Sequence, residues 1–393
     1  MNRGAGISKG SVETAPSGRV LLIAGEASAD LHGANLVRAI RGLDSGVSFQ
    51  GVGGPRMAAA GVELLVSSSD MAVVGLTEVL PRFAQIRGAS RRLKRILRFD
   101  PPDLLILMDY PEFNLYMARH AKRHGIPVLY YISPQVWAWR RGRIRKIARR
   151  VDRMAVILPF EEPLYRKTGM PVTYVGHPLL DAVPLEGGRE TALEALGITN
   201  EGPVLGILPG SRNEEVDHLL PVMLRAAEIL QGIHPGLSCV LPVASTVSFE
   251  RIASRVRETC VPVTLWHEDM HRVLPGCDVA LVASGTATLE TAIHRVPMVI
   301  AYRVSPLSYR IGRAVVRVPF IGLVNLVAGR HVVPEVIQDA VTPSRLAREA
   351  ALLLADGQTR KNVVKRLESV TAKLGSPGAS KRAAAIALKM MGR

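Results

Sequence analysis

Cysteine is scarce in this chain of 393 residues, which contains three, Cys239, Cys260 and Cys277. They lie far apart and form no C-x-x-C pair, so a disulfide framework and a cysteine-rich zinc site are both disfavoured. A reducing compartment is the expected location. Aromatic residues make up only 5% of the chain, and its basic runs lack the interleaved aromatic side chains on which single-stranded nucleic acids stack.

Long apolar runs are absent as well. No stretch approaches the roughly 18 consecutive apolar residues of a membrane-spanning helix, so any membrane contact is expected to be peripheral. The first 18 residues lack the apolar segment of a secretory signal and are predicted to form a disordered tail. The chain is nevertheless 48% hydrophobic and 21% charged. This composition excludes general disorder, and the length suggests two domains.

Acidic residues are outnumbered by basic ones. Asp and Glu total 34 against 50 Lys and Arg, which leaves a formal net charge of +16. Such an excess indicates a polyanionic partner, and the candidates are nucleic acid, an anionic membrane surface and phosphorylated substrates.

Continuous apolar segments alternate with helical patterns, which is typical of parallel strands joined by helices. The strands predicted in the first half are 20–24, 48–52, 104–108, 128–132, 153–158 and 172–175, with helices at 30–41, 82–98 and 112–124. The second half repeats the alternation, with strands at 203–208, 238–242, 262–265, 279–283 and 298–301, a helix at 215–232 and a helical end from residue 343.

We therefore predict an α/β protein with two Rossmann-like domains that face each other across a cleft. The predicted divisions are a tail at 1–18, an N-terminal domain at 19–177, a linker at 178–199, a C-terminal domain at 200–365 and C-terminal helices at 366–393, which can cross back to the N-terminal domain. Ligands of such sheets bind at the carboxyl ends of the strands, so the loops that follow the strands are the candidate site.

Two loops of the N-terminal domain carry candidate chemistry. The first strand is followed by residues 25–33, which lack the G-x-G-x-x-G pattern of a dinucleotide site. Small residues there allow a ligand to approach the next helix, although Ser28 and Asp30 are equally typical of a turn and a helix N-cap. Asp109 follows the strand 104–108, where its carboxylate could take a proton from a substrate hydroxyl; a helix N-cap is the alternative.

Two of the three tryptophans, Trp137 and Trp139, lie immediately before a run of arginines. Indole rings beside arginines pack against sugar faces or lie at membrane interfaces. A core tryptophan that caps the sheet is an equally good interpretation for at least one of them.

The C-terminal domain has two loops suited to a diphosphate. The first offers backbone N–H groups, a hydroxyl and a guanidinium ahead of a helix: Gly210, Ser211 and Arg212. The second offers hydroxyls and a glycine at a helix N-terminus: Ser284, Gly285, Thr286 and Thr288. Glu290 follows as a candidate ligand of ribose hydroxyls. No G-x-x-x-x-G-K-[S/T] sequence occurs, so nucleoside triphosphate hydrolysis is disfavoured.

Five segments occur in order along nearly the whole chain: G-E-A-S-A-D (25–30), S-P-Q-V-W-A-W-R (133–140), L-P-G-S-R-x-x-E-V (208–216), A-S-G-T-A-T-L-E (283–290) and N-L-V-A-G-R (325–330). Together they resemble the lipid-A-disaccharide synthase family, a group of inverting glycosyltransferases with the GT-B fold. The resemblance implies that the protein joins UDP-2,3-diacylglucosamine, the donor, to 2,3-diacylglucosamine 1-phosphate, the acceptor. The products are a β-1,6-linked disaccharide phosphate and UDP. The resemblance also implies a peripheral protein on the cytoplasmic face of the inner membrane, without cofactor or metal, and it is compatible with an oligomer.

Site residues follow from this resemblance position by position. Asp109 looks like the family's essential aspartate, a candidate base for the acceptor's 6-hydroxyl. Glu26 and His32 match the first-loop motif and are further catalytic candidates. On the acceptor side the matching residues are Ser28 and Asn114.

The donor side is implied in the same way. Arg212 and Asn325 look like positions that contact the donor diphosphate and sugar, beside the hydroxyl-bearing loop already described. The chain departs from the family pattern at Ala29, where Gly is usual, and at Tyr110-Pro111-Glu112, where Ala-Pro-Asp is commoner.

Basic residues cluster beside apolar segments. Residues 82–98 hold seven Arg and Lys, no acid, and apolar residues at helical spacing, which predicts a basic amphipathic helix. We predict that residues 71–98 dock on anionic lipid through Val73, Val74, Leu76, Leu80, Arg91, Arg92 and Arg95. Further basic runs lie at 140–153 and 291–334, and each run is also compatible with a solvated helix face.

Two other functions compete with this one. A different GT-B enzyme acting on UDP-N-acetylglucosamine, such as a 2-epimerase or the lipid II-forming transferase, would share the fold, but the 71–98 segment and the tryptophan motif favour the lipid A interpretation. A nucleic-acid-binding α/β protein would explain the charge. No nucleic-acid-binding module is visible, so nucleic acid is the least favoured partner.

Overall fold

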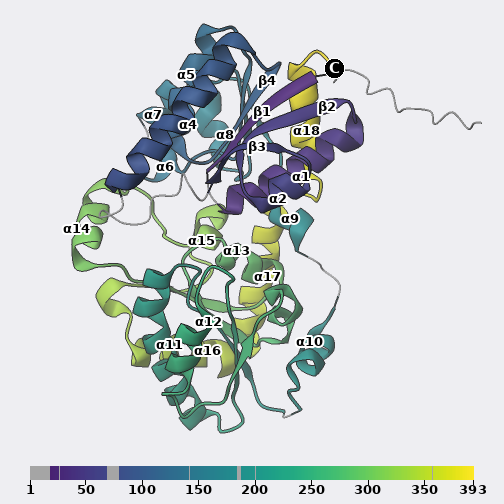
Figure 1. Ribbon diagram of the computed structural model, residues 1–393. Coiled ribbons are helices and arrows are strands. Elements are labelled where there is room, and N and C mark those ends of the chain that lie inside the picture. The colour runs from purple at the N-terminus through teal and green to yellow at the C-terminus, as the bar shows by residue number, and fades with distance from the viewer. Residues whose placement is uncertain are drawn as a thin grey trace, which may run out of the picture.

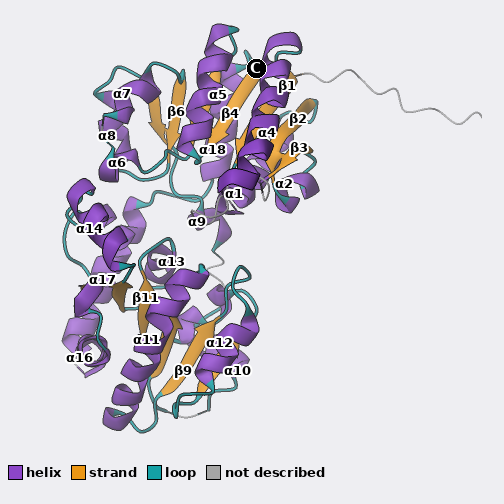
Figure 2. Cartoon of the chain, turned by 60° about the vertical axis from the view of Figure 1, so that its left-hand side comes forward, coloured by secondary structure: helices purple, strands orange, loops and turns teal. Residues whose placement is uncertain are grey.

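Two parallel sheets, each covered by helices on both faces, make up the molecule (Figures 1 and 2). This computed structural model describes residues 18–25, 27–68, 79–140, 142–183, 187–199, 201–355 and 357–393. The α/β class and the two Rossmann-like units predicted from the sequence are confirmed. Within the described residues no helix is both long and apolar enough to cross a membrane.

The first sheet has seven strands in the order β3-β2-β1-β4-β5-β6-β7. Their bounds are β1 (Gly18–Ala24), β2 (Val47–Gly53), β3 (Glu63–Ser67), β4 (Leu104–Met108), β5 (Val128–Tyr131), β6 (Arg153–Val156) and β7 (Val172–Tyr174). The central strands β1 and β4 are buried because helices cover both faces, which explains their continuous apolar sequence.

The helices of this half are α1 (Ala27–Leu43), α2 (Pro55–Ala59), α4 (Val79–Phe99), α5 (Pro111–Arg123), α6 (Val136–Trp139), α7 (Arg143–Ala148) and α8 (Glu161–Arg166). Helix α4 confirms the predicted helix at 82–98. Its side chains Leu93 and Leu97 are fully buried in the core beneath it. Its apolar face therefore covers the sheet, and what it presents to solvent is a basic stripe of Arg87, Arg91 and Arg95.

The second sheet has six strands in the order β10-β9-β8-β11-β12-β13. They are β8 (Val204–Leu208), β9 (Ser238–Pro242), β10 (Val263–Trp266), β11 (Val279–Ala283), β12 (Met298–Tyr302) and β13 (Glu335–Ile337). The accompanying helices are α11 (Asn213–Ile233), α12 (Phe249–Val256), α13 (Ala287–Ile293), α14 (Pro306–Val315), α15 (Leu323–Ala328), α16 (Pro343–Ala355) and α17 (Gly357–Lys373).

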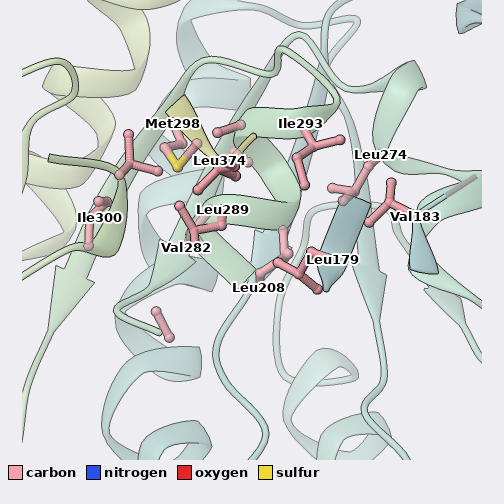
Figure 3. Close-up of a cluster of buried hydrophobic side chains, with 14 of the residues drawn as sticks. Leu179, Val183, Leu208, Leu274, Val282, Leu289, Ile293, Met298, Ile300 and Leu374 are labelled. Carbon is pink, nitrogen blue, oxygen red and sulfur yellow. The ribbon is translucent and has the colours of Figure 1, made fainter. Parts of the chain in front are cut away.

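The linker contains two short helices, α9 (Leu179–Ala182) and α10 (Arg189–Leu196). Leu179 and Val183 pack beside Leu208 and Leu274 of the C-terminal half, as Figure 3 shows. The linker is thus part of the core on that side.

The last helix, α18 (Ala379–Met390), returns to the N-terminal half and packs on α1 (Figure 1). The return is fixed by backbone bonds: His177 N–H donates to the Leu374 carbonyl at 2.9 Å. Asp181 then accepts from the N–H groups of Gly378 and Ser380 at the start of α18. The predicted crossing of the C-terminal helices is confirmed, while the exact domain boundaries stay a prediction. Residues 1–17 of the predicted tail lie outside the described residues.

Candidate functional site

Asp109 lies in a strained turn at the carboxyl end of β4. Asp109 and the next residue, Tyr110, have φ angles of 46° and 43°, in the left-handed region that side chains other than glycine rarely adopt. Such strain costs on the order of 1–3 kcal/mol per residue and persists only where neighbours enforce it.

Two buried side chains enforce the turn. The Asn114 amide donates to the carbonyls of Met108 and Asp109 at 3.0 and 2.6 Å. The Tyr130 hydroxyl donates to the same Asp109 carbonyl at 2.5 Å. Asn114 is fully buried, so these contacts give it a positioning function, and its predicted contact with the acceptor stays a prediction. Tyr130 was not predicted, because a tyrosine inside an apolar strand reads as core.

The first loop meets this turn. Strands β1 and β4 are neighbours, with Ala24 opposite Met108. A Cβ on Gly25 would lie 2.6 Å from Cγ of Tyr110, so the loop passes directly over the turn. Ser28 is exposed in the first turn of α1. The predicted catalytic residue Glu26 lies outside the described residues.

Asp30 lies in the first turn of α1 and caps the next helix, α2. It is buried in α1, and its carboxylate accepts from the N–H groups of Gly54 at 2.7 Å, Met57 at 3.0 Å and Arg56 at 3.1 Å. It therefore fixes the start of α2 next to the first loop, where a capping carboxylate is favoured.

His32 faces the segment that links the two halves. Burial lowers its pKa to about 4 although Asp181 opposes the shift. Burial and the neighbouring His32 also lower the pKa of His177 to about 3. The Nδ1 atom of His32 is buried and has no hydrogen-bond partner among the described residues. Both imidazoles are therefore neutral at pH 7, and the catalytic role of His32 stays a prediction.

The two tryptophans have different environments. Trp137 is buried, donates to the Glu161 carboxyl at 2.9 Å and packs edge-on against Phe160. Burial raises the pKa of Glu161 to about 8. Trp139 is 44% exposed, with the Arg140 guanidinium 4.0 Å from the centre of its ring. One indole is core and the other is available to a partner.

The predicted diphosphate loops lie side by side in the second half. Strands β8 and β11 pair with Leu208 opposite Val282, so the two loops leave the same sheet edge together. Gly210 has a φ of 117°, and a Cβ there would lie 2.5 Å from Oε2 of Glu215. The Ser211 N–H donates to Glu215 at 3.2 Å, and the exposed Arg212 guanidinium pairs with it at 3.0 Å. Glu215 thereby holds the loop at the N-terminus of α11.

In the second loop, two of the hydroxyl groups already donate hydrogen bonds to backbone carbonyls of the protein. The Ser284 hydroxyl donates to the Ile321 carbonyl at 3.0 Å. The fully buried Thr288 donates to the Gly285 carbonyl at 2.7 Å. Gly285 and Thr286 immediately precede α13 and are less buried than Thr288. These two are the better placed of the four to meet a ligand, while Ser284 and Thr288 shape the turn.

Glu290 and Asn325 complete the donor-side candidates. Burial, with a contribution from Asp269, raises the pKa of Glu290 to about 7, and its carboxylate is 3.6 Å from Nε2 of His271. Asn325 is fully buried: its amide donates to the Val333 carbonyl and the Glu335 carboxylate.

Glu335 is a residue that sequence reasoning missed. Its carboxylate also accepts from the N–H groups of Ile321 and Gly322. It therefore ties the segment before α15 to Asn325. The contacts of Asn325 within the protein therefore hold this segment in place. Its direct contact with the donor stays a prediction.

The two sheet edges face each other. The N–H of Arg317, which follows β12 and α14, donates to the Ala138 carbonyl, which follows β5, at 2.8 Å. Segments beyond the carboxyl ends of both sheets thus touch, with the Asp109 turn on one side and the paired loops on the other. In the described part of the chain no group of three His, Cys, Asp or Glu residues is arranged to hold a metal ion.

Comparisons with known proteins agree with this geometry. Residues 20–390 match the family described as lipid-A-disaccharide synthetase. A lipid-A-disaccharide synthase of Geobacter metallireducens is 50% identical over 97% of this chain and 99% of its own length. A crystal structure of the UDP-GlcNAc 2-epimerase from Neisseria meningitidis has a TM-score of 0.62 at 14% identity, covering 94% of this chain and 100% of that one. The calicheamicin glycosyltransferase CalG4 gives 0.61 at 17% identity, covering 96% and 99%. Both structures share the fold.

Proposed function

Because the chain belongs to the lipid-A-disaccharide synthase family, we propose that its cleft transfers 2,3-diacylglucosamine from the UDP sugar to 2,3-diacylglucosamine 1-phosphate with inversion. The chain is a hexosyltransferase. One observation supports the functions proposed below for individual residues. The Asp109 turn lies at the edge of the first sheet, and the two loops that precede α11 and α13 lie at the facing edge of the second sheet.

Asp109 acts as the base in this proposal. Its carboxylate takes the proton of the acceptor's 6-hydroxyl while that oxygen attacks the anomeric carbon of the donor. The bond from the anomeric carbon to the diphosphate breaks on the opposite face, so the configuration inverts and UDP leaves. The turn held by Asn114 and Tyr130 fixes the carboxylate before substrate arrives, which removes the orientational cost from the reaction step.

The leaving diphosphate is stabilised by the paired loops. Arg212 and the N–H groups at the starts of α11 and α13 lie where negative charge develops, and such preorganised donors stabilise a leaving anion. Glu290 binds ribose hydroxyls, and Asn325 with Glu335 holds the neighbouring segment in place.

We also place the protein peripherally on the cytoplasmic face of the inner membrane. The exposed stripe of Arg87, Arg91 and Arg95 on α4 supports attraction to anionic lipid. Val73, Val74 and Leu76 of the predicted docking segment lie outside the described residues, as does the side chain of Leu80.

The decisive experiment incubates the purified chain with both diacylated substrates in detergent and measures disaccharide phosphate and UDP by mass. Equimolar formation of the two products is expected. A parallel incubation with UDP-N-acetylglucosamine alone tests the epimerase alternative, since epimer formation there, without disaccharide in the first reaction, would overturn the proposal.

A further inference from the structure

Helix α14 buries none of its ten residues. Leu307, Ile311 and Val315 are 69%, 59% and 38% exposed. Their spacing of four residues places them on one face of the helix. Figures 1 and 2 show α14 standing out from the molecule beside α6.

A short helix that is exposed to water on every side is not expected to be stable without contacts to the rest of the protein. Isolated helices shorter than about 12–15 residues are marginal in water, and a glycine such as Gly312 weakens them further by roughly 1 kcal/mol. The helix is instead held at its ends. Gln338 bonds both backbone groups of Val304 before it, and the Arg317–Ala138 bond follows it. The apolar face is thus fixed in place, and no described residue covers it.

The charged residues within α14 and on either side of it in the sequence are all basic. Arg310 and Arg313 lie within the helix, Arg303 and Arg317 flank it, and the sequence has no Asp or Glu between residues 291 and 334. Within the part of the chain that the structure describes, none of these four guanidinium groups pairs with a carboxylate. The half-exposed Trp139 lies one residue from the Ala138 contact, and the Arg140 guanidinium that stacks on its ring also pairs with Glu112 at 2.8 Å.

We propose that α14, together with Trp139, docks on the surface of an anionic lipid bilayer. Apolar side chains flanked by arginines, with a tryptophan at the edge, match the acyl–headgroup boundary of such a bilayer. A second copy of the chain is a poorer occupant, because a symmetric contact would oppose the arginines of one copy to those of the other. The proposal rests on the membrane association proposed above and adds an attachment point in the C-terminal half.

The consequence concerns the cleft. Helix α14 follows β12 at the same sheet edge as the paired loops, and it touches the segment after β5. Docking through α14 therefore brings the facing carboxyl ends of the two sheets close to the lipid surface. Diacylated sugars can then reach the proposed site without exposing their acyl chains to water.

The test uses the full chain in co-sedimentation with vesicles of phosphatidylcholine alone or with phosphatidylglycerol. The variant Leu307→Ser/Ile311→Ser/Val315→Ser is compared with a control variant that removes three apolar side chains of similar exposure from α11 and α16: Ile229→Ser/Ile233→Ser/Leu352→Ser. The α14 variant should bind mixed vesicles at least about tenfold more weakly, and the control like the parent. Equal binding by both variants would overturn the proposal.

Amide hydrogen exchange locates the contact. Residues 306–315 should become protected when mixed vesicles are added. Protection that instead rises with protein concentration in the absence of lipid would identify a second copy and overturn the lipid assignment. If charge reversal on α4 releases the chain while the α14 variant stays bound, membrane association stands without α14. If the parent binds no vesicle, both membrane proposals fail, and the product assay in detergent still judges the transferase on its own.

Discussion

At Asp109 the function and the stability of the turn depend on different atoms. The proposed base uses the side-chain carboxylate, whereas the turn is held through backbone carbonyls by Asn114 and Tyr130. Asp109→Asn should therefore lower kcat by about 10²–10⁴-fold and leave the unfolding midpoint and UDP binding unchanged. Product formation measured with both substrates, beside urea unfolding, checks this.

Asn114→Ala is the matched comparison. It removes the amide donor of the buried Met108 carbonyl and one of the two side-chain donors of the Asp109 carbonyl, so it should lower the free energy of unfolding by about 2–4 kcal/mol as well as the activity. Parent-like turnover in Asp109→Asn would remove Asp109 from the base role, and a stable Asn114→Ala would show that the turn does not depend on the Asn114 amide.

His32 gives the molecule a pH-dependent contribution to stability. Its pKa falls to about 4 in the folded chain from 6.5, so the unfolded chain takes up the proton first. The contribution is complete above pH 6.5 and is lost as the pH falls toward 4, at up to about 1.4 kcal/mol per pH unit. Glu161 has the opposite trend, because its pKa rises to about 8 from 4.5: its contribution is complete below pH 4.5 and is lost as the pH rises to 8.

Comparing variants separates the two trends. The difference in unfolding free energy between the parent and His32→Gln should shrink as urea titrations move from pH 7.5 to pH 4.5. The control is His218→Gln, which replaces an exposed histidine of α11 and should change the free energy of unfolding little, as is usual for surface substitutions. A difference for His32→Gln that is constant with pH would contradict the neutral, buried imidazole.

The position of a candidate residue relative to the strands could be predicted from the sequence, whereas its backbone angles and hydrogen bonds could not. Asp109, Arg212 and Glu290 could be placed beyond the carboxyl ends of the strands because each follows a strand whose continuous apolar run predicts it. Positive φ angles at Asp109 and Tyr110 could not be predicted, because neither residue type requires them. Nor could the internal bonds of Thr288 and Asn325, since a hydroxyl or an amide in a loop motif is compatible with a ligand and with the backbone alike.

Among the elements, α4 shows how one pattern can serve two purposes. Leu93 belongs to the buried face, so Leu93→Ala should cost about 2–5 kcal/mol of unfolding free energy. Arg87→Glu/Arg91→Glu/Arg95→Glu changes only the exposed stripe, so it should leave folding nearly unchanged and release the chain from anionic vesicles. Urea unfolding and co-sedimentation at low and high salt measure the two effects.

Arg92 is left out of that triple variant for a structural reason. Its guanidinium donates to the Leu65 carbonyl of β3 at 2.7 Å, so its replacement would mix a loss of stability with a loss of charge. Unchanged vesicle binding by the triple variant at low salt would refute docking through α4.

Strand prediction succeeded wherever burial on both faces produced a continuous apolar run, as in β4 and β11. It failed at β3 and β13, which were not predicted. Both are sheet edges, short and only partly buried, so their sequences lack that run. The order of strands and the return of α18 depend on contacts between distant segments, for which the local pattern carries no signal.

At the scale of the whole molecule, α18 returns from the C-terminal half and packs on α1 of the N-terminal half. We call this contact the clasp. Asp181, in the linker, caps α18 through the N–H groups of Gly378 and Ser380, and Arg382 donates to the Val175 carbonyl at 2.8 Å. Asp181→Ala removes the cap and should lower the free energy of unfolding by about 1–2 kcal/mol. Since the cap lies between the two halves, the loss should appear first as faster amide exchange in α18.

The control for the clasp is Asp100→Asn, which breaks an exposed ion pair with Arg19 and should change stability by less than about 1 kcal/mol. Exchange in α13, which packs in the C-terminal half, should stay at the parent rate in Asp181→Ala. If α18 and α13 instead accelerate together, the chain opens as one cooperative unit and the clasp has no separate stability. A selective opening of α18 would mean that the two sheets can change their separation at the linker while each keeps its own half of the site intact.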